Sequence, residues 1–291
     1  MARLVEDAAL LFRLLNGPDP RDPQTLAWTP ADPLPALSRG VAGLRLAVFP
    51  DVERVGVDKE VLSAYDTAIE TFAKLGARIV QPALPHRFSD YAATTGRIIG
   101  AEGYRFVGHI VDDENLPTAP HVRPRIQLGR SISARDYLMT LAEREEHKRA
   151  FATAISEVDA LLTPTTQTAA IPIDQVDQSG TAAHFTRAGN YPGLCGLAMP
   201  NGFTANGLPT SLQILSHPGA EAMALRIGWA YEQATAWHTR RPPEAWSRSL
   251  YPRRKSTMKL RSSLASEVAP ACLIINSSSR VRSSSTFSTP D

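Results

Sequence analysis

The sequence has few cysteines and lacks a long apolar run. Cys195 and Cys272 are the only cysteines among 291 residues, too few for a disulfide framework and typical of a protein from a reducing compartment. No apolar stretch approaches the ~18 residues of a membrane-spanning helix. We therefore expect a cytoplasmic protein that does not cross a membrane.

A strong charge imbalance and the usual ion-binding motifs are also missing. The formal net charge of +2, from 31 basic and 29 acidic residues, gives no indication of a nucleic-acid partner. No grouping of His, Cys, Asp and Glu has metal-ligand spacing, and no glycine-rich loop suits a phosphate. Glu143, Glu145 and Glu146 alternate with basic residues, as on a solvated helical surface. We expect neither a metal nor a cofactor.

Apolar periodicity predicts an α/β domain over residues 1–246. Helices are expected at 3–16, 58–75, 88–111 and 134–157, and strands at 44–49, 78–82 and 160–163. Asn206-Gly207 lies between two short apolar runs and predicts a β-hairpin, followed by a helix that ends near 236–238. This order favours a mixed β-sheet flanked by helices.

The composition changes after Trp246. Residues 247–291 are rich in serine and arginine and lack amphipathic periodicity, which predicts a disordered tail because such a composition cannot bury a core. A basic, phosphorylatable tail that touches nucleic acid or an acidic partner is the functional alternative. A short apolar patch at 270–276 interrupts the tail without an evident role.

Several segments have distinctive motifs in a fixed order. The sequence begins MARLVEDAALL, and Gly17–Pro23 has the pattern G-x-D-x-x-D-P. Asp159–Thr165 reads D-A-L-L-T-P-T, and Asn190–Ile214 has the pattern N-x-x-G-L-x-G-L-x-x-P-x-G-F-x-x-N-G-L-P-x-x-L-Q-I. Together these segments resemble the amidase signature family, serine hydrolases that cleave carboxamide C–N bonds. The resemblance implies the C-terminal part of that fold over residues 1–246.

The resemblance also shows which catalytic groups are missing. In the family, a neutral lysine deprotonates a nucleophilic serine through a second serine next to a cis peptide bond, and a Gly/Ser-rich loop stabilises the oxyanion. All of these groups precede a segment like Met1–Leu11, and no comparable Gly/Ser-rich run occurs here. A lysine must be buried among apolar residues for its pKa to fall towards neutrality. We expect no such burial for any lysine of the sequence, which are Lys59, Lys74, Lys148, Lys255 and Lys259. We expect no catalytic residue in this chain.

Two functional hypotheses follow. The chain is either the C-terminal portion of an amidase that acts on a small-molecule amide, and is inactive alone, or a non-catalytic pseudo-amidase or binding subunit. An amidotransferase-like subunit is a sub-case of the first. The sequence specifies neither the amide nor the oligomeric state, so homo-oligomerisation stays open.

The resemblance points to one substrate-binding residue. Arg125 opens a segment with the family pattern R-I-x-x-G-x-x-x-S-x-x-x-Y, and in the tRNA-dependent amidotransferase branch an arginine of this segment binds the substrate carboxylate. Arg123 and Arg130 are alternatives, and an exposed structural arginine is the other interpretation. Asn190 and Gly193 are expected in a structural loop, with a buried Asn190 amide that binds backbone groups.

Cys195 stands where the family usually has proline. A thiol nucleophile paired with His184 or His217 is formally conceivable, but an inert apolar cysteine is the favoured interpretation. His238 is expected at a helix terminus, where a positive charge suits the helix dipole.

Overall fold

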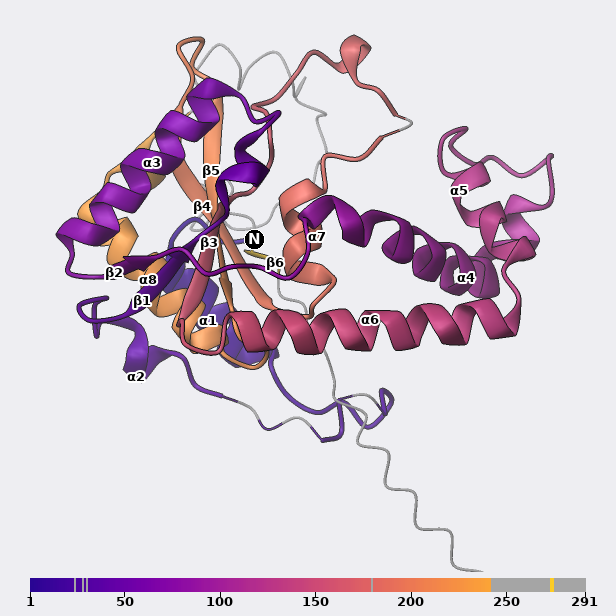
Figure 1. Ribbon diagram of the computed structural model, residues 1–291, viewed down its shortest axis with the longest axis horizontal. Coiled ribbons are helices and arrows are strands. Elements are labelled where there is room, and N and C mark those ends of the chain that lie inside the picture. The colour runs from indigo at the N-terminus through magenta and orange to yellow at the C-terminus, as the bar shows by residue number, and fades with distance from the viewer. Residues whose placement is uncertain (24, 28, 30, 179, 242–272, 275–291) are drawn as a thin grey trace, which may run out of the picture.

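A mixed β-sheet lies at the centre of the structure, and helices cover both of its faces (Figure 1). The computed structural model describes residues 1–23, 25–27, 29, 31–178, 180–241 and 273–274. The strands follow the order β2-β1-β3-β5-β4-β6. Their bounds are Arg45–Val48 for β1, Arg78–Val80 for β2, Ala160–Pro164 for β3, Cys195–Phe203 for β4, Pro209–Ser216 for β5 and Leu273–Ile274 for β6. The predicted α/β fold with a mixed sheet is confirmed.

The strand direction reverses at β3. Strand β1 runs parallel to β2 and β3, whereas β5 pairs antiparallel with both β3 and β4. Every residue of β3 is buried, as expected for a strand that is covered on both faces. The parallel and antiparallel parts of the sheet therefore share one fully buried strand.

Strands β4 and β5 form the predicted hairpin. Thr204 N donates to Leu208 O at 2.8 Å, and Gly207 N donates to Thr204 O at 2.9 Å. Gly207 has a φ of +77°, a conformation that glycine adopts without a steric cost. The Asn-Gly signal thus located the turn correctly.

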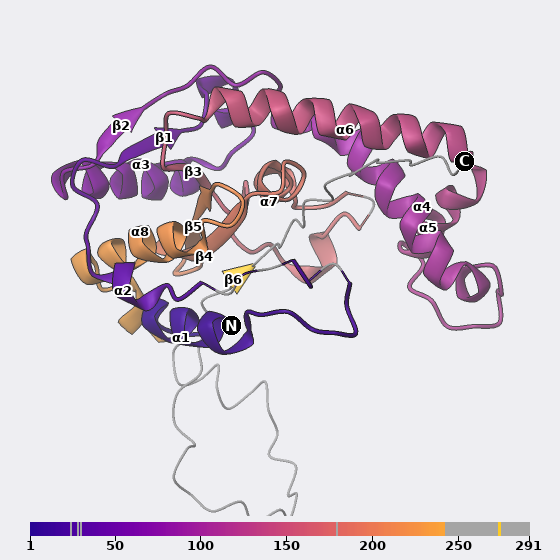
Figure 2. The same cartoon turned by 90° about the horizontal axis from the view of Figure 1, so that it is seen from below.

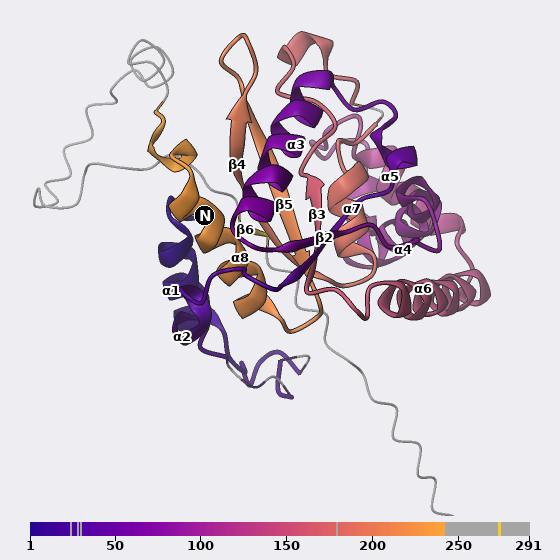
Figure 3. The same ribbon diagram turned by 60° about the vertical axis from the view of Figure 1, so that its left-hand side comes forward.

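Helices α3 (Lys59–Lys74) and α8 (Glu221–Ala234) pack on one face of the sheet, where the ring centroids of Phe72 and Tyr231 are 5.2 Å apart. Helices α1 (Val5–Leu15) and α2 (Leu34–Leu37) lie against α8 (Figure 3). Helix α7 (His184–Asn190) covers the opposite face (Figure 2). Gly189 permits its close approach, because a Cβ there would lie 2.5 Å from Leu215 Cδ2.

Two long helices extend sideways from the sheet. They are α4 (Tyr91–Val111) and α6 (Ala134–Ala154), with α5 (Arg123–Gln127) and the 3₁₀ turn η3 (Leu128–Ser131) at their far end (Figures 1 and 2). The 3₁₀ turn η2 (Phe88–Asp90) precedes α4. Helix α8 ends at Ala234, so the expectation that it reaches 236–238 is wrong, and η5 (Trp237–Thr239) holds His238 in a separate turn.

Most of the predicted tail, 247–291, lies outside the described residues. Its residues Leu273–Ile274 pair antiparallel with Gly196 and Leu197 of β4, and the disordered tail stays a prediction. A backbone with unpaired hydrogen-bonding groups at a sheet edge favours such pairing. Among the described residues, no helix combines the length and the apolar character that crossing a membrane requires.

The backbone of η3 packs directly on α4, and we predict that Gly129→Ala destabilises the protein. A Cβ at Gly129 would collide with Gly100 O, a backbone atom that cannot move aside alone. We expect the free energy of unfolding to fall by about 1–3 kcal/mol in urea denaturation. Gly96→Ala in α4, the helix that contains Gly100, is the control: a Cβ there meets nothing within 4 Å. It should be neutral or raise stability by up to about 1 kcal/mol. Equal effects of the two substitutions would contradict a packing constraint at Gly129.

Candidate functional site

The carboxyl ends of β1 and β3 lie at the same edge of the sheet, because the two strands are parallel. The 3₁₀ turn η1 (Asp51–Arg54) follows β1, and the connection 165–183, which contains η4 (Ile173–Gln175), follows β3 and leads into α7. In open α/β sheets, ligands bind outside the carboxyl ends of the strands. This carboxyl edge is therefore the candidate functional site.

A buried carboxylate joins η1 to α7 at the carboxyl edge. Glu53 is only 5% exposed, its Oε1 accepts from Phe88 N at 2.9 Å, and its Oε2 lies 2.9 Å from His184 Nε2. Both carboxylate oxygens thus have a partner, which offsets the cost of burying them. Sequence reasoning considered His184 only as a partner for a thiol and missed Glu53, because 131 positions separate the two residues.

A second polar group lies in the sheet beneath this edge. The buried Gln213 of β5 donates from Nε2 to Thr163 Oγ1 and to Phe185 O, both at 3.1 Å. Thr163 in turn donates its hydroxyl to Pro164 O at 2.8 Å. The Gln213 side chain therefore links β5, β3 and α7. Because the 165–183 connection runs from the end of β3 to the start of α7, these bonds determine the positions of both of its ends.

Arg125 holds the 165–183 connection from the far end of the long helices. Its Nη2 donates to Gln178 O at 2.6 Å and to Gly180 O at 2.9 Å. On the other side, Asp58 N donates to Gln167 O at 2.9 Å. The connection is thus tethered near both ends, and the exposed guanidinium of Arg125 binds backbone carbonyl groups there.

The two alternatives to Arg125 have local partners. Arg123 donates to the carbonyl oxygens of Val111, Asp113 and Leu116 and so closes the turn between α4 and α5. Arg130 Nη2 lies 3.9 Å from Asp112 Oδ2. Within the described residues, neither side chain donates a hydrogen bond to the 165–183 connection. Of the three candidates, Arg125 is the one that donates to the 165–183 connection.

The loop prediction at Asn190 is wrong in one respect. Asn190 is the last residue of α7 and is exposed, so its side chain is not the buried amide that we expected. Its backbone carbonyl accepts from Gly193 N at 3.2 Å, and Gly193 has a φ of +83°. The turn therefore uses the Asn190 backbone and the freedom of glycine to adopt a positive φ.

Cys195 is a buried residue of β4, and its Sγ donates to His217 O at 3.2 Å. Burial, with a further contribution from the charge of Glu221, raises the pKa of the Cys195 thiol to about 12. His184 binds Glu53, and His217 Nε2 lies 2.7 Å from Val158 O. Neither imidazole is hydrogen-bonded to the thiol, and this geometry favours the inert interpretation of Cys195.

The described residues contain no nucleophile paired with a Lys or His base, although the Ser133 hydroxyl is bonded to the Asp136 carboxylate at the start of α6. None of their Ser, Thr or Cys side chains is hydrogen-bonded to a Lys or His side chain. Lys59 and Lys74 are exposed, Lys148 Nζ lies 2.8 Å from Glu145 Oε1, and the other two lysines lie outside the described residues. That part of the chain also contains no group of three or more His, Cys, Asp and Glu side chains that could hold a metal.

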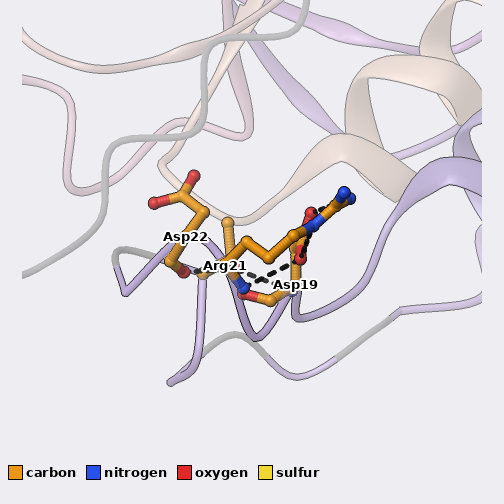
Figure 4. A network of polar contacts seen from close by, with 4 residues as sticks. Asp19, Arg21 and Asp22 are labelled. Carbon is orange, nitrogen blue, oxygen red and sulfur yellow. Dashed lines mark hydrogen bonds and ion pairs between the residues drawn. The ribbon is translucent and has the colours of Figure 1, made fainter.

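The G-x-D-x-x-D-P motif forms a turn between α1 and α2 (Figure 4). Arg21 donates from Nε and Nη2 to the two carboxylate oxygens of Asp19, at 3.1 and 2.9 Å, and its backbone N donates to Asp19 Oδ1 at 2.9 Å. These bonds hold the pKa of the Asp19 carboxyl below its usual value. These bonds indicate that the motif has a structural role, which is to stabilise a surface turn.

The sequence comparisons agree with these motifs. A family model described as Amidase matches residues 1–225. The chain belongs to the amidase family. This amidase-family chain is 33% identical over 270 residues to a glutamyl-tRNA(Gln) amidotransferase subunit of Chloroflexus aggregans, a match that covers 83% of the chain and 55% of the relative. The corresponding subunit of Trichlorobacter lovleyi is 32% identical over 271 residues, with the same coverage.

Solved structures of the amidase family have the same fold. The same glutamyl-tRNA(Gln) amidotransferase subunit from Thermotoga maritima superimposes with a TM-score of 0.67 at 26% identity and covers 81% of this chain. A bacterial aryl acylamidase of the amidase signature family gives 0.68 at 22% identity and covers 82% of the chain. The matches cover 52% and 53% of those proteins. The chain thus spans about half the length of the relatives it matches.

We predict that the Cys195 thiol of this amidase-family chain does not react with Ellman's reagent at pH 8 in the folded state. A thiol with a pKa near 12 is protonated at that pH, and the protonated form is a poor nucleophile. The measurement uses a Cys272→Ser background, so that only Cys195 is present. Adding urea should expose the thiol and release one equivalent of chromophore. Rapid labelling without urea would contradict the inert interpretation.

We also predict that Arg125→Gln loosens the 165–183 connection. The shorter, uncharged side chain does not reach the carbonyl groups of Gln178 and Gly180 with a charged donor. Hydrogen exchange read by mass spectrometry should become at least about tenfold faster across the connection, which corresponds to about 1.4 kcal/mol. Arg130→Gln is the matched control and should leave that exchange unchanged. The tether is disproved if both variants exchange like the parent chain.

Proposed function

We propose that this chain is the C-terminal portion of an amidase and takes part in the hydrolysis of a carboxamide C–N bond. The match to the amidase family over residues 1–225 carries the proposal, because it includes the motifs that the sequence presents in order. The polar groups gathered at the carboxyl edge support it, since that edge is where open α/β sheets bind their ligands. A small-molecule amide is the proposed substrate class.

The proposed reaction proceeds through an acyl-enzyme. A serine hydroxyl, deprotonated by a neutral lysine through a bridging serine, attacks the carboxamide carbon, and the C–N bond breaks. The nitrogen leaves as ammonia or an amine with the transferred proton, and water then hydrolyses the ester to release the carboxylic acid. We assign the two serines and the lysine to polypeptide outside these 291 residues. The reason is that no Ser–Lys pair occurs among the described residues and that the sequence has no Gly/Ser-rich run of the family kind. The reaction needs neither a metal nor a cofactor.

In the proposed enzyme, this chain contributes the sheet and one wall of the substrate site. We propose that Arg125 affects substrate binding as a positioning residue, through the carbonyl groups of the 165–183 connection. The turn at Asn190 and Gly193 has a structural role at the end of α7. A cytoplasmic location is part of the proposal and is supported by the free thiol of Cys195.

A role as one subunit of a larger complex is the second candidate. The names of the relatives that are 32% and 33% identical favour it, because each is one subunit of a glutamyl-tRNA(Gln) amidotransferase. In this alternative, the chain binds other subunits, and the polypeptide without a nucleophile–base pair is a pseudo-amidase or a binding subunit. The two candidates differ in whether the same polypeptide that contains residues 1–291 also carries a reactive serine.

We predict that the purified 291-residue chain releases no ammonia from small aliphatic or aryl amides. The physical reason is that a serine hydroxyl without a neighbouring base is a poor nucleophile. Ammonia release is measured by a coupled enzymatic assay, with Cys195→Ala and Cys272→Ala as controls for thiol chemistry. Turnover that persists in both variants would mean that the chain has a catalytic group that we have not identified.

A fluorophosphonate probe, which labels activated serines, separates the two candidates in the endogenous protein. Intact mass and peptide mapping then locate the label. An amidase requires a mass above that of residues 1–291 and a labelled serine outside them. An unlabelled protein with the mass of residues 1–291 would reject the amidase proposal and favour a binding subunit.

A further inference from the structure

Strand β4 has one side that is almost free of strand partners. Its other side pairs with β5 along most of its length, whereas its outer side pairs only with Leu273–Ile274 of β6 (Figure 2). Within the described part of residues 1–241, no strand pairs with this outer side. An edge strand presents a row of backbone N–H and C=O groups that another extended segment can bind.

The side chains of β4 are nevertheless buried like those of an interior strand. Neighbouring residues of a strand point to opposite faces of the sheet, and Leu197 and Ala198 are only 2% and 7% exposed. Both faces of β4 are therefore covered, as is typical of a strand that has neighbours on both sides. The burial of β4 and the near absence of partners on its outer side thus favour an additional strand at this edge.

The usual protection of an open edge is missing from the first half of β4. Proteins protect such edges with charged side chains, proline or a bulge. Residues 195–199 read C-G-L-A-M and contain neither a charge nor a proline. The first interruption is Pro200, which has no N–H, and the register with β5 shifts between Pro200 and Gly202. The part of the edge that is competent to pair is therefore 195–199.

The residues that pair with this edge lie in the apolar patch of the tail. Residues 271–276 read A-C-L-I-I-N, without a charge or a proline, and three serines follow at 277–279. Short uncharged segments rich in β-branched and apolar residues favour strands. Leu273 and Ile274 pair antiparallel with Leu197 and Gly196, respectively. The composition of the tail and the register of the sheet thus indicate the same segment.

We propose that the 195–199 edge is a strand-addition site and that Leu273–Ile274 of the same chain occupies it as an intramolecular strap. The strap supplies backbone partners to β4, and a strand from another molecule must displace it before pairing there. Because the strap belongs to the same polypeptide, it competes at a high effective concentration. This interaction surface does not depend on the proposed amidase activity.

Replacing both strap residues by proline removes their backbone N–H groups and should open the edge. The variant is the full chain with Leu273→Pro and Ile274→Pro, and Ser284→Pro with Ser285→Pro is the matched control in the same tail. Hydrogen exchange across 195–199 should become at least about tenfold faster in the strap variant alone. Exchange across β5 should not change, because β5 keeps both of its partners. Equal exchange across 195–199 in the strap variant and the parent chain would overturn the proposal.

A peptide supplied in solution tests whether the opened edge accepts a strand. The probe is a fluorescein-labelled peptide of residues 269–278 with serine in place of Cys272, and binding is read by fluorescence anisotropy. It should bind the strap variant at least about tenfold more tightly than the parent chain, in which the strap competes. The control with two prolines at 284 and 285 should behave like the parent. Binding to neither chain, or equal binding to both, would refute a strand-addition site.

An engineered disulfide distinguishes a strap of the same chain from a segment of a second copy. Register partners of antiparallel strands have Cα atoms about 4.5–5.5 Å apart, within the range of a disulfide. Leu197→Cys with Leu273→Cys, in a background with Cys195→Ser and Cys272→Ser, should therefore form a disulfide within the monomer on oxidation. Leu197→Cys with Ser284→Cys is the control outside the register and should not.

The products are separated by mass spectrometry without reductant. Disulfide-linked dimers would identify a second copy as the occupant and would overturn the intramolecular strap, as would an unlinked product. If Leu197→Cys prevents folding, as judged by thermal unfolding, the proline variants decide the question because they leave β4 unchanged.

Discussion

The antiparallel pairing of β3 with β5 is the contact on which the rest of the structure depends. Strand β3 is buried throughout, and it joins the parallel strands β1 and β2 to the hairpin formed by β4 and β5. At the register position Thr163↔Gln213, the two side chains are hydrogen-bonded, and Gln213 also binds Phe185 O of α7. A slip of one residue would turn Gln213 to the opposite face and would leave a buried amide without partners.

Local signals in the sequence were sufficient for most of the fold. Helical spacing predicts one buried face for α3, formed by Val61, Tyr65, Ala68, Ile69, Phe72 and Leu75. Four of the six are buried, and Ile69 and Leu75 are partly buried against the core. The Asn206-Gly207 turn placed the hairpin, because its geometry is determined by residues that are adjacent in the chain. The ends of elements were less predictable. Helix α8 stops at Ala234 since residues 237–239 form a 3₁₀ turn against the start of α1, a contact that depends on the two ends of the domain meeting.

The candidate site was much less predictable, because its bonds join distant segments. Glu53 and His184 are 131 positions apart, and Arg125 reaches carbonyl groups more than fifty positions further along the chain. A backbone carbonyl has no side-chain signature, so the resemblance identified Arg125 but not what it binds. Asn190 illustrates the converse: its motif was recognised, but the pattern could not reveal that the turn uses the backbone of this residue while its side chain is exposed.

In the proposed amidase, the contacts at the carboxyl edge limit what this chain contributes to catalysis. Glu53 and Gln213 bind polar groups at that edge, and Arg125 holds backbone carbonyl groups of the 165–183 connection. The one thiol in the described residues is protonated at neutral pH. Such groups position a wall and exclude water, but they do not activate a nucleophile. In the proposed amidase, the role of this edge is therefore to keep the substrate site in shape while the reactive groups come from other polypeptide.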